Sequence, residues 1–127
     1  MPQRKETEQK TRRMNNGENR KLCGLLGLAA KAGKVQSGEF CTEKSLKSGR
    51  AKLCIVASDA SGPTKKKFAD ICAFRNIPIE SGLFDKNALG HVIGKEMRAS
   101  VTVEDAGFAE GLLSLIEGGN ADDKRKQ

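Results

Sequence analysis

Tryptophan and tyrosine are absent from this chain of 127 residues, and phenylalanine occurs only five times. With so few aromatic side chains, the interior must be built from leucine, isoleucine, valine and alanine. No apolar run approaches the ~18 residues that a membrane-spanning helix needs, and the polar N-terminus lacks the features of a secretory signal. The length suits one domain with a modest core. We therefore expect a cytoplasmic protein without membrane contact.

Metal-binding and disulfide frameworks are lacking as well. Cys23, Cys41, Cys54 and Cys72 lie 18, 13 and 18 positions apart, so no C-x-x-C pair occurs, and His91 is the single histidine. Zinc sites and small disulfide scaffolds both need a different ligand spacing. The cysteines are better explained as small apolar side chains in a reducing compartment. We expect no metal and no cofactor.

Positive charge is in excess, with a formal net charge of +7, and most of the excess lies near the chain ends. Residues 1–21 hold seven Lys or Arg against three acids, and residues 120–127 hold three against two. We expect a disordered basic arm over 1–18, one folded domain over 19–119 and a disordered charged tail over 120–127. A basic arm can add sequence-independent phosphate contacts, although the same composition also serves solubility.

The stretch GLAAKAGKVQSG at 27–38 invites comparison with phosphate-binding loops. P-loop nucleotidases follow the pattern G-x-x-x-x-G-K-[ST], which opens a helix after a strand. Here five residues separate Gly27 from Gly33, Val35 follows Lys34, and the stretch ends a helical pattern. The sequence therefore argues against a nucleotide site at this position.

Apolar residues at helical spacing and capping side chains predict five helices. Their expected first or capping residues are Asn19, Gly38, Ser61, Asp85 and Asp105. Four short extended segments lie between them, KVQS at 34–37, KLCIVAS at 52–58, IPI at 77–79 and SVTVE at 100–104. The second is nearly all apolar, as in a strand covered on both faces, and Pro78 places the third near an edge. The alternation predicts an α/β fold, a three-layer α/β/α sandwich with a four-stranded mixed sheet.

Catalytic constellations are poorly represented. His91 lies fifty residues from Cys41, the thiol best placed at a helix N-terminus to act as a nucleophile. Glu104 and Asp105 are adjacent, but Asp105 is explained as a helix cap. We predict a protein that is not an enzyme. A thiol enzyme using Cys41 is a rival hypothesis, which rapid selective alkylation at neutral pH would support.

The helix expected over 38–48 carries a candidate binding face. Phe40, Lys44 and Lys47 lie at i, i+4 and i+7 and so share one side. The ring can stack on an unpaired RNA base, while ammonium groups and first-turn N–H groups hold phosphates. The alternative is that Phe40 packs inward as a hydrophobic staple and the lysines are simply solvated.

Two further basic segments are candidates, TKKKF at 64–68 and GKEMRA at 94–99. Three lysines in the first turn of a helix oppose its dipole, and a neighbouring phosphate would make that arrangement favourable.

Four segments, LLGLAAKAGKVQSGE, KSLKSGRAKLCIVASDAS, KNALGHVIGKE and VTVEDAGFAEGL, occur in this order over about residues 20–117. They resemble the kink-turn-binding ribosomal protein superfamily called L-seven-Ae or L-thirty-e, in its bacterial YlxQ type. The resemblance implies an α/β/α sandwich, no enzymatic activity and binding of structured RNA, often a kink-turn. Strong binders of this kind open the second helix with glycine, followed by polar base-reading residues and a lysine.

On this resemblance Gly38 and Lys44 match the binding pattern, whereas Phe40 and Cys41 replace the polar residues that read purine edges. Missing base-edge hydrogen bonds weaken discrimination, while phosphate contacts keep affinity. Lys31 and Lys34 are expected to approach RNA phosphate beside the helix that Gly38 allows to come close to the backbone. The complete set of expected RNA-binding residues is Lys31, Lys34, Gly38, Glu39, Phe40, Cys41, Lys44, Lys47, Ser61, Lys65, Lys86, Lys95, Met97, Arg98 and Ala99.

The expected function is therefore non-catalytic binding of kink-turn or similarly bent structured RNA through the N-terminus of the second helix. Structured RNA, ribosomal RNA included, is the expected partner, with the ribosome as a possible assembly and a monomer as the expected state. The alternative is a protein–protein interaction module on the same fold, which Phe40 in place of a polar base reader favours.

Overall fold

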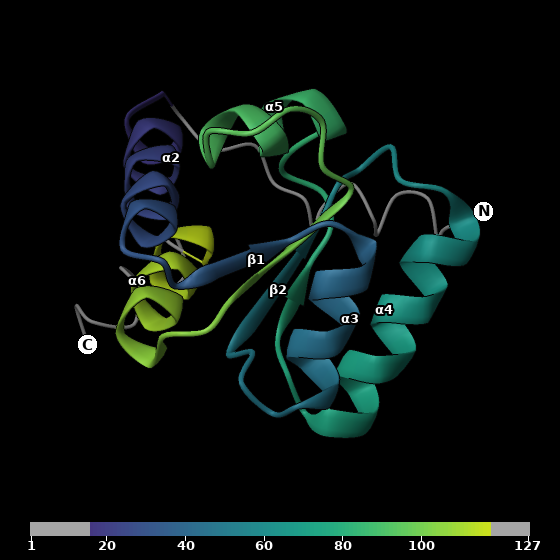
Figure 1. The fold of residues 1–127 in the computed structure, drawn as a ribbon. Helices are drawn as coiled ribbons and strands as arrows, with labels where there is room; N and C mark the ends of the chain where they lie inside the picture. Colours follow the sequence, from purple (N-terminus) through teal and green to yellow (C-terminus); the bar gives the residue numbers. More distant parts are fainter. Residues whose placement is uncertain (1–15, 118–127) are drawn as a thin grey trace.

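The computed structural model describes residues 16–117, in which helices alternate with short strands (Figure 1). The helices are α2 (Asn16–Lys31), α3 (Glu39–Lys47), α4 (Gly62–Arg75), α5 (Lys86–Val92) and α6 (Ala106–Ile116). The strands are β1 (Val35–Ser37), β2 (Leu53–Val56), β3 (Ile79–Glu80) and β4 (Ser100–Val103). The predicted order of elements is confirmed, while most of the predicted arm and the whole of the predicted tail lie outside the described residues.

The four strands form one mixed sheet in the order β1-β4-β2-β3. β4 runs antiparallel to both β1 and β2, whereas β2 and β3 are parallel. Figure 1 shows α3 and α4 side by side on one face of the sheet and α2 with α6 on the other. The predicted three-layer sandwich is confirmed, and Pro78 directly precedes the edge strand β3 as expected.

The central strands β2 and β4 are buried along their whole length. In β4 the two valines pack in the apolar core, while Ser100 and Thr102 face α3. The Ser100 hydroxyl donates to Thr42 Oγ1 at 2.9 Å, and the Thr102 hydroxyl donates to Ser45 Oγ at 2.8 Å. The polar positions of this strand are therefore buried and hydrogen-bonded, which removes the cost of burying unpaired hydroxyls.

Helix starts follow the predicted caps with one exception. Ser61, Asp85 and Asp105 each accept a hydrogen bond from a backbone N–H in the first turn of their helix. The prediction of Asn19 as a cap is wrong, because α2 already begins at Asn16. The first turn of α2 is polar in sequence, and Asn19, Arg20 and Lys21 are exposed, so apolar periodicity does not reveal where the helix starts.

Candidate functional site

Three helices begin at the same end of the sheet, which is the upper end in Figure 1. α3, α4 and α5 start where β1 and β2 end and where β4 begins. Backbone hydrogen bonds hold the start of α3 to β4 and the start of α5 to the loop over 95–99: Gly38 N–H donates to Ser100 O at 3.1 Å, and Arg98 N–H donates to Lys86 O at 3.2 Å. Helix N-termini carry partial positive charge and free N–H groups. This end of the molecule is therefore suited to anions.

Gly38 turns the chain from β1 into α3. Its φ is 91° and ψ 155°, a backbone conformation that favours glycine. A Cβ there would meet no atom within 4 Å, so the requirement is conformational rather than steric. No side chain caps α3, in contrast to α4, α5 and α6. The first-turn N–H groups of α3 therefore remain free of side-chain acceptors.

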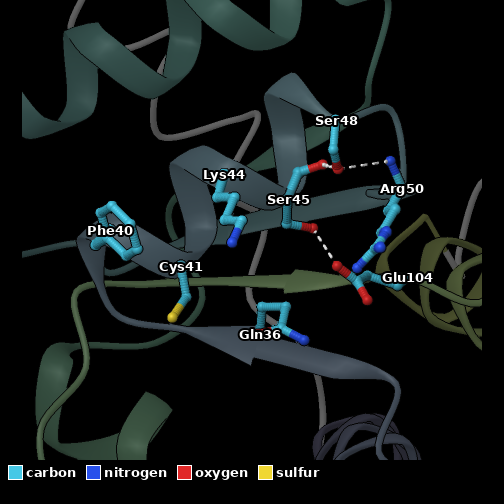
Figure 2. A pocket seen from close by; sticks show the side chains of 8 residues that line it. All are labelled: Gln36, Phe40, Cys41, Lys44, Ser45, Ser48, Arg50 and Glu104. Atoms are coloured by element: carbon cyan, nitrogen blue, oxygen red, sulfur yellow. Dashed lines mark hydrogen bonds between the residues drawn. The ribbon is translucent and has the colours of Figure 1, made fainter.

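Phe40 projects from the first turn of α3 and is 76% exposed. Figure 2 shows its ring beside Cys41, with Lys44 one turn further along. Cys41 and Lys44 are exposed too, and within residues 16–117 no ion pair involves Lys44. We call Gly38, Phe40, Cys41 and Lys44 the α3 N-terminal surface. The alternative of an inward-packed Phe40 is wrong.

Glu39, Glu43 and Lys47 of α3 belong instead to an ion-pair network with α4. Lys67 Nζ of α4 lies 2.8 Å from Glu39 Oε2 and 2.9 Å from Glu43 Oε1, and Lys47 Nζ lies 2.7 Å from Glu43 Oε2. Hydrogen bonds from Lys47 and Lys67 lower the pKa of Glu43 from 4.5 to about 2. Lys47 thus differs from Lys44, although the two were expected to act together.

The three lysines at the start of α4, residues 65–67, differ in whether they form an ion pair and in the residue with which they form it. Lys66 pairs with Asp70 at 3.0 Å, and Lys67 pairs with α3. Lys65 is half-buried and, within residues 16–117, takes part in no ion pair. Ser61 is the N-cap, since its Oγ accepts from Thr64 N–H at 3.2 Å. Of the three lysines, Lys65 is therefore the one whose ammonium is available for a ligand.

The loop over 95–99 is held in place from two sides. Arg98 Nε donates to Ser37 Oγ at 3.1 Å, and Arg98 Nη1 donates to Met97 O at 2.9 Å. A Cβ on Gly90 of α5 would lie 1.7 Å from Glu96 O, so only glycine admits the loop at this distance. Arg98 therefore braces the loop, while Lys95 is exposed and Met97 is 55% exposed.

The remaining expected residues divide between two locations. Lys86 and Ala99 are half-buried beside the α3 N-terminal surface, and Asp59 Oδ1 accepts from Lys86 N–H at 2.9 Å. Lys34 lies before β1, at the other end of this strand from Gly38. Lys31 ends α2 on the same side as Lys34. Both lysines therefore lie at the end of β1 away from Gly38, and their expected contact with RNA phosphate stays a prediction.

A hollow of about 250 Å³ lies along the flank of α3 (Figure 2). It is lined by Gln36, Phe40, Cys41, Lys44, Ser45, Ser48, Arg50 and Glu104. The Ser45 hydroxyl donates to Glu104 Oε2 at 2.6 Å, which holds the carboxylate at the base of the hollow. Gln36, Arg50 and Glu104 were not expected here, because their meeting depends on strand register rather than on local spacing.

The histidine and cysteine side chains within residues 16–117 are the remaining candidates for catalysis or metal binding. His91 is exposed on α5, and the four thiols are free, with Cys54 and Cys72 buried. Over residues 16–117 no three His, Cys, Asp or Glu side chains come together in a way that could hold a metal ion. Nor is any helix in this range long and apolar enough to cross a membrane.

Known proteins resemble this chain in sequence and in fold. The RNA-binding protein YlxQ of Bacillus subtilis is 44% identical over 93 residues, covering 73% of this chain and 92% of that protein. The large ribosomal subunit protein eL30 of Yarrowia lipolytica is 31% identical over 111 residues, covering 87% and 98%. A solved structure of a Bacillus halodurans protein of unknown function has a TM-score of 0.73 at 40% identity, covering 76% and 97%. Residues 20–113 match the family model, and the chain belongs to the ribosomal protein L7Ae/L30e/S12e/Gadd45 family.

Proposed function

We propose that this protein binds structured RNA without catalysis, and that kink-turn or similarly bent RNA meets the α3 N-terminal surface. The observation that carries the proposal is Phe40, a ring 76% exposed at a helix start that no side chain caps. Relatives described as an RNA-binding protein and as a ribosomal protein support it. We further propose a cytoplasmic monomer that acts on ribosomal RNA or on the ribosome.

Each part of the surface has a distinct task in this proposal. The Phe40 ring stacks on a base that is splayed from its helix, a contact worth about 1–3 kcal/mol. The first-turn N–H groups of α3 and the Lys44 ammonium take the adjoining phosphates. Lys65, Lys86 and Lys95 surround this position and add phosphate contacts from α4, α5 and the braced loop.

Selectivity for bent RNA comes from shape in this proposal. Phe40 and Cys41 offer no carboxylate or amide to a base edge, so direct reading of purines is weak. A kink brings phosphates of two stems and an unstacked base to one point, where three helix starts and the 95–99 loop meet. A straight duplex presents no free base for Phe40. Moderate preference for bent RNA is therefore expected.

The test is a gel shift with a kink-turn RNA and a straight duplex of equal length, at two salt concentrations. Phe40→Ala should weaken binding of the kink-turn by about tenfold or more, because a base stack is lost, and should change duplex binding little. Phe74→Ala is the matched control, since Phe74 is 83% exposed on α4 and should leave both affinities unchanged. Equal, weak binding of both RNAs by the unaltered chain would contradict the specific proposal.

A protein–protein interaction module is the second candidate. Phe74 favours it, because a ring 83% exposed near the half-buried Ile71 offers apolar area for a partner. Nucleic acid that co-purifies with the chain would separate the two candidates. In a chain without Trp and Tyr, an absorbance maximum near the nucleic-acid band that disappears after nuclease treatment supports RNA binding.

A further inference from the structure

A second group of cations gathers at the end of the sheet opposite the α3 N-terminal surface. Lys34, Arg50 and Lys52 are all exposed there, and we call them the strand-end cluster. Together with Glu104 they line a hollow of about 400 Å³. Over residues 16–117 none of the three takes part in an ion pair. Their charges are therefore available to an anion.

Strand register brings the cluster together. Glu104 N–H donates to Lys34 O at 2.8 Å, and Lys52 N–H donates to Val103 O at 2.7 Å, so three strand ends stand in one row. Neighbouring strands lie about 4.8 Å apart, which places the two lysines about 10 Å from each other with the glutamate between them. Along a strand, side chains alternate between the two faces of the sheet, so residues directly opposite each other on neighbouring strands point to the same face. Glu104 points toward α3, because its carboxylate accepts a hydrogen bond from the Ser45 hydroxyl. The row therefore faces α3.

Two glycines complete the arrangement. Gly33 (φ 75°) precedes Lys34 at the end of α2, and Gly49 (φ 84°) precedes Arg50 at the end of α3. Both have the left-handed conformation with which helices commonly end. Ser48 Oγ accepts from Arg50 N–H at 3.4 Å and supports the second turn. Arg50 is thereby placed between the end of α3 and the start of β2.

The strand-end hollow adjoins the hollow beside Phe40, because Arg50 and Glu104 line both. We call the two adjoining hollows together the α3 groove. α3 has nine residues, so the groove extends over about 14 Å at about 1.5 Å per residue. Lys44 lies between the ends of the groove (Figure 2). Four cations against one carboxylate make the groove positive.

We propose that the α3 groove holds the phosphate backbone of an RNA strand that continues from the α3 N-terminal surface toward the strand-end cluster. The inference rests on the proposed RNA binding and adds the path of the strand. A groove of about 14 Å is long enough for several consecutive phosphates of one strand. Lys44, Arg50, Lys34 and Lys52 neutralise them without reading sequence.

The test compares the salt dependence of RNA binding. In the full chain, Lys34→Gln, Arg50→Gln and Lys52→Gln are combined, and binding of a kink-turn RNA with long stems is titrated over a range of salt. Each lost phosphate contact lowers the slope of log affinity against log salt by about 0.7–0.9, so the triple variant should lose about 2 from its slope. An unchanged slope would overturn the proposal that the α3 groove holds an RNA backbone.

A second triple variant controls for net charge. Arg20→Gln, Lys21→Gln and Arg75→Gln remove the same number of positive charges from exposed positions on α2 and α4. Its slope should stay close to that of the unaltered chain, and equal losses in both triple variants would contradict a defined groove. Thermal melting of each variant shows that the fold is kept.

Glu104→Gln should change RNA affinity in the opposite direction to the loss of the cations. The amide still accepts from the Ser45 hydroxyl, so the base of the groove is preserved while a negative charge beside the phosphates is removed. RNA binding should become several-fold tighter at low salt. Weaker or unchanged binding would argue that no phosphate lies there.

The two proposals fail differently in these measurements. If the kink-turn preference persists while the slope of the first triple variant is unchanged, the groove is wrong and the proposed function stands. If that slope falls for bent and straight RNA alike with no preference between them, the groove stands and the kink-turn proposal is wrong. Absence of RNA binding by the unaltered chain overturns both.

Discussion

At the scale of single residues, the site depends on glycines whose roles differ. Gly38 is needed for its backbone conformation, whereas Gly90 is needed for space, because a Cβ would lie 1.7 Å from Glu96 O. The backbone of Gly90 also contacts the loop through a hydrogen bond, because Lys95 N–H donates to Gly90 O at 2.8 Å. Gly90 therefore sets the position of the 95–99 loop.

Gly90→Ala should displace that loop. We expect a loss of about 1–3 kcal/mol in the free energy of unfolding from overpacking, together with weaker kink-turn binding. Gly24→Ala is the control, because a Cβ at this exposed helical position meets nothing within 4 Å and should stabilise by about 0.5–1 kcal/mol. Denaturant unfolding and a gel shift measure both effects. If Gly90→Ala behaved like Gly24→Ala, the loop would not be seated as described.

Sequence spacing groups residues on one face of a helix more readily than it shows what that face contacts. The spacing put Phe40 on one side of the second helix with Lys44 but left open whether its ring packs inward, and the structure shows the ring exposed. Arg98 was expected to contact RNA, yet its guanidinium is hydrogen-bonded to Ser37 and to carbonyl groups of its own loop. The hydrogen-bond partners of a long side chain such as that of Arg98 depend on the tertiary fold, and local sequence patterns do not reveal them.

At the scale of elements, α3 and α4 are joined by the ion pairs around Glu43. The pKa of Glu43 is about 2 in the folded chain and 4.5 ordinarily, so its pairing stabilises the fold above pH 4.5. That contribution is lost as pH falls from 4.5 toward 2. The pKa of Lys67 is raised, chiefly by its hydrogen bond to Glu39, and its own contribution is lost only at strongly alkaline pH.

Lys67→Gln should therefore lower the melting temperature at neutral pH and less so in acid, where the carboxylates are protonated. Lys66→Gln, which breaks the exposed pair with Asp70 inside α4, should have a smaller effect at both pH values. High salt should reduce the difference between the two variants. A Lys67→Gln effect that is as large in acid as at neutral pH would show that the ion pairs are not its cause.

The boundaries of helices and strands could be predicted where a particular residue type caps a helix or restricts a strand. Asp85 and Asp105 cap their helices and Pro78 precedes the edge strand, each for a local reason. The start of α2 was missed, because its first turn carries no apolar stripe. Pairing between α3 and α4 could not be anticipated either, since Lys67 and Glu39 are twenty-eight positions apart.

At the scale of the whole molecule, the sheet separates two groups of exposed residues at its two ends. Residues before β1, after α3 and after β4 gather at one end, and the starts of three helices gather at the other. Periodicity predicted the layers but not this division, because the order β1-β4-β2-β3 depends on non-local pairing. Lys34 was predicted to contact phosphate beside the second helix; it lies at the end of β1 away from Gly38, and the contact itself stays a prediction.

The most direct test of the central claim is an NMR titration of the backbone amides with a kink-turn RNA. The account predicts that the largest shift changes fall at 38–44, 61–65, 86 and 95–99, with smaller changes at 34 and 50–52. The α4 surface around Phe74 should remain unaffected. Shift changes centred on Phe74 and β3, with the start of α3 unperturbed, would contradict the account.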